Sequence, residues 1–309
     1  MTEQQKKYIE ANIDLIENDK WKEFFKNAPD GMGEVLYEAG INFMTVLKYI
    51  PKNAFARCSN ITSITIPNDV TNIGEFAFDH CTSLKNITIP DSVISISNHA
   101  FCECSNLMSA TIGKSVANIN YAAFAGCTSL TSITLPDIVT SISDYTFSRC
   151  SSLTRITIPD SVTNIGEGAF QNCTHLTNIS IPNSVTNMGS SVFRFCNSLT
   201  SVTIGNSVTS IGSYAFQNCS SLTSITIPDS VTSIDIYAFS GCSSLKRIDI
   251  QNSIISIDDS AFDDLGSDVV INFRGTKEQW ENLISDDIAV FKNTRYTCNC
   301  VDGAVRKSR

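Results

Sequence analysis

The sequence lacks the groups on which most enzymes depend. Its 309 residues include three histidines, His80, His99 and His175, at positions that permit neither a catalytic triad nor a three-histidine ligand set. There is no glycine-rich phosphate loop and no Gly-x-Ser-x-Gly nucleophile elbow. We therefore expect no enzymatic activity and no cofactor.

Positive charge and long apolar runs are also scarce. The chain has 22 basic and 31 acidic residues, and between Phe55 and Phe273 it has 8 basic and 17 acidic ones. This acidity argues against nucleic acid and anionic membranes as partners. The first residues are polar, and no following segment is apolar enough to serve as a signal peptide or to cross a membrane. We therefore expect no membrane insertion, a cytoplasmic location and a monomer.

The sequence does contain a strict internal repeat. Phenylalanines from Phe55 to Phe262 recur every 23 residues, and a cysteine follows each by three positions until Leu265 replaces it. Columns of Leu, Ile and Val recur at the same interval upstream of each phenylalanine. A fixed period in the range of about 20–29 residues with a Leu-x-x-Ile-x-Ile core is typical of leucine-rich repeats.

Each repeat predicts a small amount of local structure. In Ser-Ile-Thr-Ile-Pro the apolar and polar side chains alternate, which indicates a short strand that ends at the proline. Val-Thr-x-Ile is a second extended piece on the opposite side of the coil, and Ala-Phe-x-x-Cys is long enough for a single helical turn only. One repeat buries too little apolar surface to fold alone, so the coils must stack into an array.

These columns resemble a known family. The consensus Cys-x-x-Leu-x-x-Ile-x-Ile-Pro-x-x-Val-x-x-Ile-Gly-x-x-Ala-Phe-x-x-Cys is similar to the BspA-like leucine-rich repeats of bacterial surface proteins, and the similarity runs from about Ile41 to Phe273. The resemblance implies an α/β solenoid: a right-handed array of about ten 23-residue coils with a parallel β-sheet on its concave side. It also implies adhesion or protein binding, a surface or secreted location, and no catalytic residues.

The twelve cysteines predict buried thiols rather than a metal site. Nine of them occupy one inward-facing column, where a small residue fills a corner of each coil. Coils about 4.8 Å apart would also permit disulfides between neighbours, but without an export signal reduced thiols are favoured. Cys298-Asn-Cys300 and Cys102-Glu-Cys104 lack the further ligands that zinc needs. We predict no metal site.

The two ends of the chain break the period. Residues 1–40 predict short helices that include Trp21, Phe24 and Phe25. They form either a cap over the first coil or a docking module with exposed aromatics. Residues 41–273 form the predicted solenoid. Residues 274–309 predict a helix with a capping box at Thr276 and Gln279, then a strand and a frayed tail from Val305.

The candidate binding residues lie on the outward side of the predicted concave sheet. Small Ser and Thr side chains fill most of its rows, and the two arginines in these rows could anchor a partner. The candidate residues are Arg155, Thr157, Asn178, Ser180, Thr203, Thr226, Arg247 and Asp249. Two functions stay open: recognition of a protein or a glycan by this face, or an intracellular scaffold whose N-terminal helices do the docking.

Overall fold

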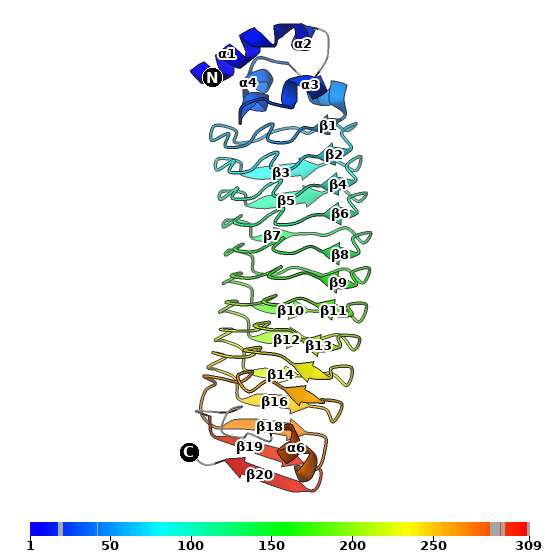
Figure 1. The fold of residues 1–309 in the computed structure, drawn as a ribbon, viewed down its shortest axis with the longest axis vertical. Helices are drawn as coiled ribbons and strands as arrows, with labels where there is room; N and C mark the ends of the chain where they lie inside the picture. The colour runs from blue at the N-terminus through cyan, green and yellow to red at the C-terminus, as the bar shows by residue number, and fades with distance from the viewer. Residues whose placement is uncertain (18–20, 42, 285–290, 292–293, 308–309) are drawn as a thin grey trace. The chain divides into compact units, whose positions relative to one another are not determined.

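The computed structural model describes residues 1–17, 21–41, 43–284, 291 and 294–307 (Figure 1). The chain divides into two compact units, Met1–Val139 and Thr140–Arg309. Each unit consists of stacked 23-residue coils with parallel strands, so the predicted parallel solenoid is confirmed. The units are described in turn.

The first unit begins with five short helices. They are α1 (Glu3–Ala11), α2 (Ile13–Glu17), α3 (Trp21–Phe25), α4 (Met32–Glu38) and α5 (Phe43–Leu47). α1 starts at Thr2 with a capping box that Gln5 completes, a signal that we did not use in the sequence. The segment Asn18-Asp19-Lys20, whose sequence predicts a break between two helices, lies outside the described residues. Phe43 and Leu47, at the two ends of α5, stand two repeats before Ile89 and Val93, so this helix replaces the turn that follows the strand in later coils.

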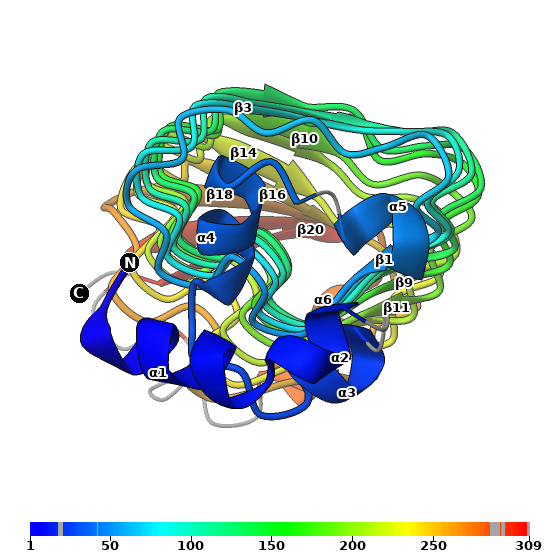
Figure 2. The ribbon, with the colours of Figure 1, turned by 90° about the horizontal axis from the view of Figure 1, so that it is seen from above.

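The helices lie over the open end of the first coil (Figure 2), and aromatic side chains join them to it. The ring of Phe43 lies 4.8 Å from that of Phe25 and 5.9 Å from that of Phe55, centroid to centroid. α4 also contacts the first coil, where the Gly33 amide donates to the Ala54 carbonyl at 2.6 Å. A Cβ atom at Gly33 would collide with that carbonyl, so glycine is required here.

The strands of the first unit form two parallel sheets on different sides of the coil. One sheet contains β1 (Tyr49–Ile50), β2 (Asn72–Ile73), β4 (Ser95–Ile96) and β6 (Asn118–Ile119). The other contains β3 (Asn86–Ile89), β5 (Ser109–Ile112) and β7 (Ser132–Ile133). Every pair is offset by one repeat, because equivalent residues of consecutive coils face each other.

The second unit continues the same two kinds of strand. The short strands are β8 (Ser141–Ile142), β9 (Asn164–Ile165), β11 (Asn187–Met188), β13 (Ser210–Ile211), β15 (Ser233–Ile234) and β17 (Ser256–Ile257). The longer ones are β10 (Asn178–Ser180), β12 (Ser201–Thr203), β14 (Ser224–Thr226), β16 (Arg247–Ile250), β18 (Val269–Phe273), β19 (Tyr296–Cys300) and β20 (Gly303–Lys307). β14, β16, β18, β19 and β20 form one sheet, in that order.

The Ala-Phe-x-x-Cys segments form single hydrogen-bonded turns. In the coil of Phe193, the Cys196 amide donates to the Phe193 carbonyl at 3.1 Å, and the Phe193 amide donates to Ala215 in the next coil at 2.8 Å. The turn departs from a helix because Ser191 and Phe195, on either side of Phe193, have φ values of 59° and 62°. Such left-handed residues cost on the order of 1 kcal/mol each, which the bonds to the neighbouring coil offset.

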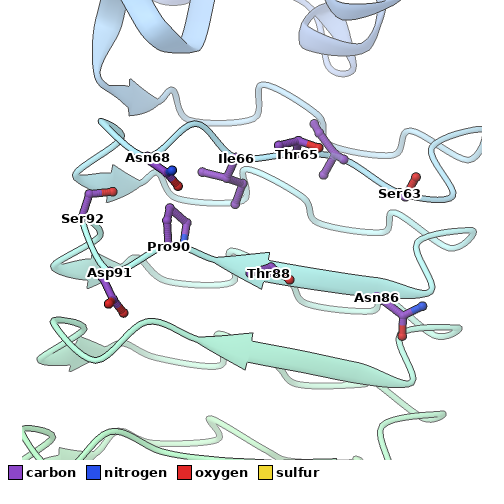
Figure 3. A pocket seen from close by; sticks show the side chains of 10 residues that line it. Ser63, Thr65, Ile66, Asn68, Asn86, Thr88, Pro90, Asp91 and Ser92 are labelled. Carbon is purple, nitrogen blue, oxygen red and sulfur yellow. The ribbon is translucent and has the colours of Figure 1, made fainter.

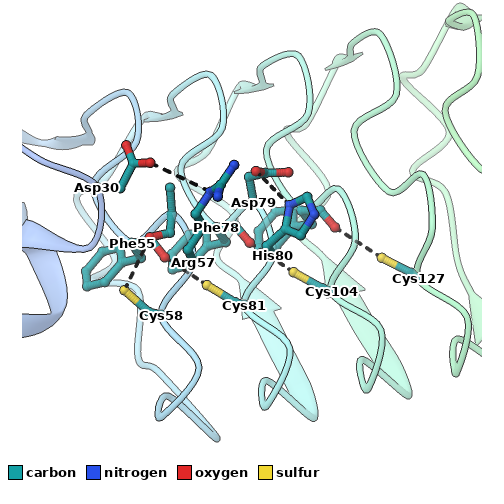
Figure 4. Close-up of polar contacts among 12 residues, drawn as sticks. Asp30, Phe55, Arg57, Cys58, Phe78, Asp79, His80, Cys81, Cys104 and Cys127 are labelled. Carbon is teal, nitrogen blue, oxygen red and sulfur yellow. Dashed lines mark hydrogen bonds and ion pairs between the residues drawn. The ribbon is translucent and has the colours of Figure 1, made fainter.

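Phenylalanine and cysteine form the two most regular columns of the core. The phenylalanine rings stack with centroids 5.0 Å apart at Phe55 and Phe78 and 5.4 Å apart at Phe193 and Phe216, and all are fully buried. Most column thiols donate to the carbonyl of the phenylalanine one coil earlier, as for Cys104 and Phe78 at 3.0 Å, whereas the Cys58 thiol donates to the Ala56 carbonyl of its own coil (Figure 4). All twelve cysteines are free, and the column cysteines are buried, as predicted.

The C-terminal region contains a predicted helix and an unpredicted strand. α6 (Lys277–Leu283) starts at Thr276, and the predicted capping box with Gln279 is confirmed. The side chain of Trp280 is fully buried against Phe273 and Tyr296. The frayed tail predicted from Val305 is wrong: β20 pairs antiparallel with β19 and covers the last strand of the sheet. A turn at Asp302 and Gly303 reverses the chain into this hairpin.

Candidate binding face

The candidate site is the outward side of the longer strands in the second unit, which we call the strand face. Strand residues alternate between core and solvent, and in β10 the side chain of Ile179 is buried while Asn178 and Ser180 are exposed. The same alternation in β12 and β14 exposes Thr203 and Thr226. The face is therefore a set of rows in which equivalent residues of consecutive coils stand side by side.

The structure places the predicted residues on this face with few exceptions. Asn178 pairs with Ser201, and Ser180 pairs with Thr203, on β10 and β12. Thr226 pairs with Asp249 on β14 and β16, and both Arg155 and Thr157 are exposed in the coil before β10. Arg155 is not part of a regular strand, although the repeat predicts one there. Within the described part of the chain, its guanidinium makes no hydrogen bond or ion pair.

Arg247, the second predicted anchor, is held by its neighbours. Its Nε atom lies 3.0 Å from each carboxylate oxygen of Asp249. Asp249 also accepts a hydrogen bond from Asn272 Nδ2 at 2.6 Å, and Asn272 Oδ1 accepts one from Asn299 Nδ2 at 2.9 Å. A ladder of polar side chains therefore crosses β16, β18 and β19 and fixes the arginine on the face.

The electrostatics of this ladder favour charged groups. The carboxylate of Asp249 is half-buried, which by itself raises its pKa, but the hydrogen bonds from Arg247, Asn272 and Thr226 outweigh that effect and lower the pKa. The pKa of Arg247 is raised by its hydrogen bonds to Asp249. Both side chains are thus ionised at neutral pH, and the pair keeps one orientation.

Asn272 and Asn299 are the residues of this face that sequence reasoning missed. Asn272 follows the repeat, 23 residues after Asp249, but Asn299 lies 27 residues further because α6 interrupts the period. The available signal was the alternation in Tyr-Thr-Cys-Asn-Cys, which matches that of Val-Val-Ile-Asn-Phe in β18. Aligning the two segments by their alternation would have placed both asparagines in one row.

The other candidate sites have less support from the structure. Among the described residues, no group of three or more His, Cys, Asp or Glu side chains is placed to hold a metal ion. Cys298 and Cys300 lie with their sulfurs 3.7 Å apart, and burial raises the pKa of both thiols. At the N-terminal end Phe24 and Phe25 are buried, contrary to a docking module that exposes them. The side chain of Trp21 lies outside the described residues.

The repeating coils, their parallel strands and the stacked core define a leucine-rich-repeat solenoid, a class of protein that serves as a binding scaffold. The chain belongs to the family described as the BspA type leucine-rich repeat region, which matches residues 48–177 and 163–282. Members of this family are typically surface or secreted proteins. No helix in the described parts of this chain has the length and apolar character needed to cross a membrane.

Solved structures with similar repeats come from several bacteria. A leucine-rich cell surface protein from Faecalibacterium prausnitzii A2-165 is 28% identical, with 76% of this chain and 85% of that chain covered and a TM-score of 0.36. A leucine-rich-repeat protein from Bacteroides ovatus ATCC 8483 is 26% identical, with coverages of 81% and 87% and a TM-score of 0.41. No curated protein matches the chain significantly.

Proposed function

We propose that the protein is a non-enzymatic binding protein that recognises a protein partner on the strand face of its second unit. The observation that carries the proposal is the composition of that face. Its rows consist mostly of short Ser, Thr and Asn side chains, from Asn178 on β10 to Asn299 on β19, and a partner can approach the sheet closely across them.

Arg155 and Arg247 supply the anchors on this otherwise uniform surface. Arginine contributes disproportionately to binding energy at protein interfaces, because its planar guanidinium makes several directed hydrogen bonds. Arg155 is exposed and has no partner among the described residues, so its donors are available. The fixed orientation of Arg247 lowers the conformational entropy that it would lose on binding.

The family to which the chain belongs supports a location outside the cell, whereas the polar N-terminal residues led us to expect the cytoplasm. We propose a surface or secreted location on the strength of the family. Immunodetection in surface, secreted and cytosolic fractions of the native organism tests this part. Recovery of the protein from the cytosol alone would contradict it and would favour an intracellular scaffold.

Blocking the strand face tests the binding proposal. In a variant with Thr203→Arg and Thr226→Arg, two long side chains stand where the partner approaches. The matched control has Thr209→Arg and Thr232→Arg, which change exposed threonines of the same coils on a different side. Partners are captured from native surface fractions with the full chain and quantified by mass spectrometry.

We expect the face variant to lose about tenfold or more of the specific partner, while the control stays within about twofold. Equal capture by both variants would overturn the proposal. A third variant, Ile13→Asp, tests docking by the N-terminal helices, because Ile13 is 46% exposed on α2. Loss of capture by this variant alone would move the function to those helices.

A further inference from the structure

The strand face ends in a hollow with two arginines at its rim. The hollow has a volume of about 720 Å³ and lies over β16, β18 and β19. Its lining includes Arg247, Arg274, Asn272, Asn299 and Val301. A volume of this size can accept several residues of an extended peptide.

This hollow differs in charge from the others along the strands. The hollow at Thr65 and Asp91 in the first unit is lined by small polar and apolar groups with one carboxylate, and it has no lysine or arginine (Figure 3). The hollow at Thr226 and Asp229 in the second unit is likewise without a cation. The hollow at the end of the face has two guanidinium groups and one carboxylate among its lining residues, which leaves one net positive charge.

Both arginines keep hydrogen-bond donors that the described residues do not use. Arg247 uses Nε to bind Asp249, and its two terminal nitrogens make no hydrogen bond with the described residues. The side chain of Arg274 is exposed, and it makes no hydrogen bond or ion pair within the same part of the chain. A guanidinium with free terminal nitrogens binds a carboxylate through two parallel hydrogen bonds.

We propose that this hollow binds an acidic peptide segment of the partner, with Asp or Glu carboxylates on Arg247 and Arg274. The inference rests on the proposed function and names the chemistry that the partner would present. The ladder of Asn272 and Asn299 holds Arg247 in place, so little side-chain entropy is lost when a carboxylate binds.

Two observations favour a peptide over a sugar. The aromatic residue of the lining, Phe273, is 3% exposed, so it offers no open ring face to a sugar. A polyanionic glycan needs a run of cations along its length, whereas the next hollow along the second unit presents Asp229 instead of a cation. The net charge of −9 disfavours an acidic ligand on the chain as a whole, so the positive charge of this hollow would make the binding of such a ligand selective.

Fluorescence anisotropy with two labelled octapeptides tests the inference. One alternates Ser and Glu, and the other alternates Ser and Gln, so they differ in charge but not in length. Each is titrated with the full chain and with the variants Arg247→Gln, Arg274→Gln and Lys85→Gln. Lys85→Gln is the matched control, because it removes the same charge from an exposed side chain outside the strand face.

We expect the Ser-Glu peptide to bind and each hollow variant to weaken its affinity by about fivefold or more. The Lys85→Gln variant and the parent chain should agree within about twofold. Binding of the Ser-Glu peptide should weaken at high salt, because these charges are exposed to solvent. Thermal unfolding of Arg274→Gln should match that of the parent, since its side chain has no internal bond to lose.

Three outcomes would overturn the inference. They are equal binding of the Ser-Gln peptide, an equal loss in Lys85→Gln, and arginine-dependent binding of heparin without binding of the Ser-Glu peptide. The proposed function is judged separately by the Thr203→Arg and Thr226→Arg variant. If that variant captures less partner, as expected, but the parent chain does not bind the Ser-Glu peptide, only the acidic-peptide inference is refuted.

Discussion

The thiol column offers a direct test of how the coils hold together, through Cys219. Its side chain is fully buried, and its Sγ atom donates to the Phe193 carbonyl at 3.1 Å. That carbonyl also accepts the Cys196 amide at 3.1 Å, so removing the thiol leaves the oxygen with one partner. The substitution Cys219→Ala therefore removes an apolar atom from the core and one of two hydrogen bonds to the same oxygen.

The two losses can be estimated separately. A buried group the size of a methylene contributes about 0.8 kcal/mol, and the small cavity left behind adds to this. An intramolecular hydrogen bond contributes about 0.5–1.5 kcal/mol net. We therefore expect Cys219→Ala to lower the free energy of unfolding by about 2 kcal/mol.

Two further substitutions at Cys219 distinguish the contributions. Cys219→Ser keeps a donor of similar shape and should be more stable than Cys219→Ala, whereas Cys219→Val keeps the apolar bulk without a donor. Urea unfolding of the full chain, followed by circular dichroism, gives the midpoints and slopes. The hydrogen-bond argument fails if the serine variant is less stable than the alanine variant, because the thiol would then act only as an apolar filler.

Four other outcomes are expected. Labelling of the native protein should modify few of the twelve thiols, chiefly the two half-buried ones, and denatured protein should expose them all; extensive oxidation in freshly isolated protein would contradict this. Burial raises the pKa of Cys196 and Cys242 to about 12, above that of the unfolded thiol, so both stabilise the fold fully below pH 9. The free energy of unfolding should therefore fall by about 1.4 kcal/mol per thiol for each pH unit above pH 9. This fall should be steeper in the parent than in a Cys196→Ala, Cys242→Ala double variant. Arg155→Ala and Arg247→Ala should each weaken partner binding by about 1 kcal/mol or more and leave thermal stability almost unchanged. Deleting residues 1–40 exposes the apolar end of a coil and should cause aggregation or a loss of cooperative unfolding, which light scattering and calorimetry would detect.

The strict 23-residue period made the coil architecture predictable from sequence. Phe55 and Phe78 stand one repeat apart, and alternation in each Ile-x-Ile segment decides which side chains face the core. The coils must then stack, because no single coil can bury its own apolar side chains. The caps of α1 and α6 also depend on local residues only, as at Thr276, where a side chain three residues away completes the capping box.

Contacts between coils and between distant segments were decided by tertiary structure alone. The left-handed conformation of Phe195 is stable only because its amide bonds to the next coil, at Gln217. The pairing of β20 with β19 depends on a reversal of the chain at Gly303, which lies beyond the last repeat and is therefore not marked by the 23-residue period. The polar ladder that orients Arg247 includes Asn299, which α6 separates from Asn272 in the sequence. Because the inserted helix shifts the register, the 23-residue period does not predict that these two asparagines are neighbours.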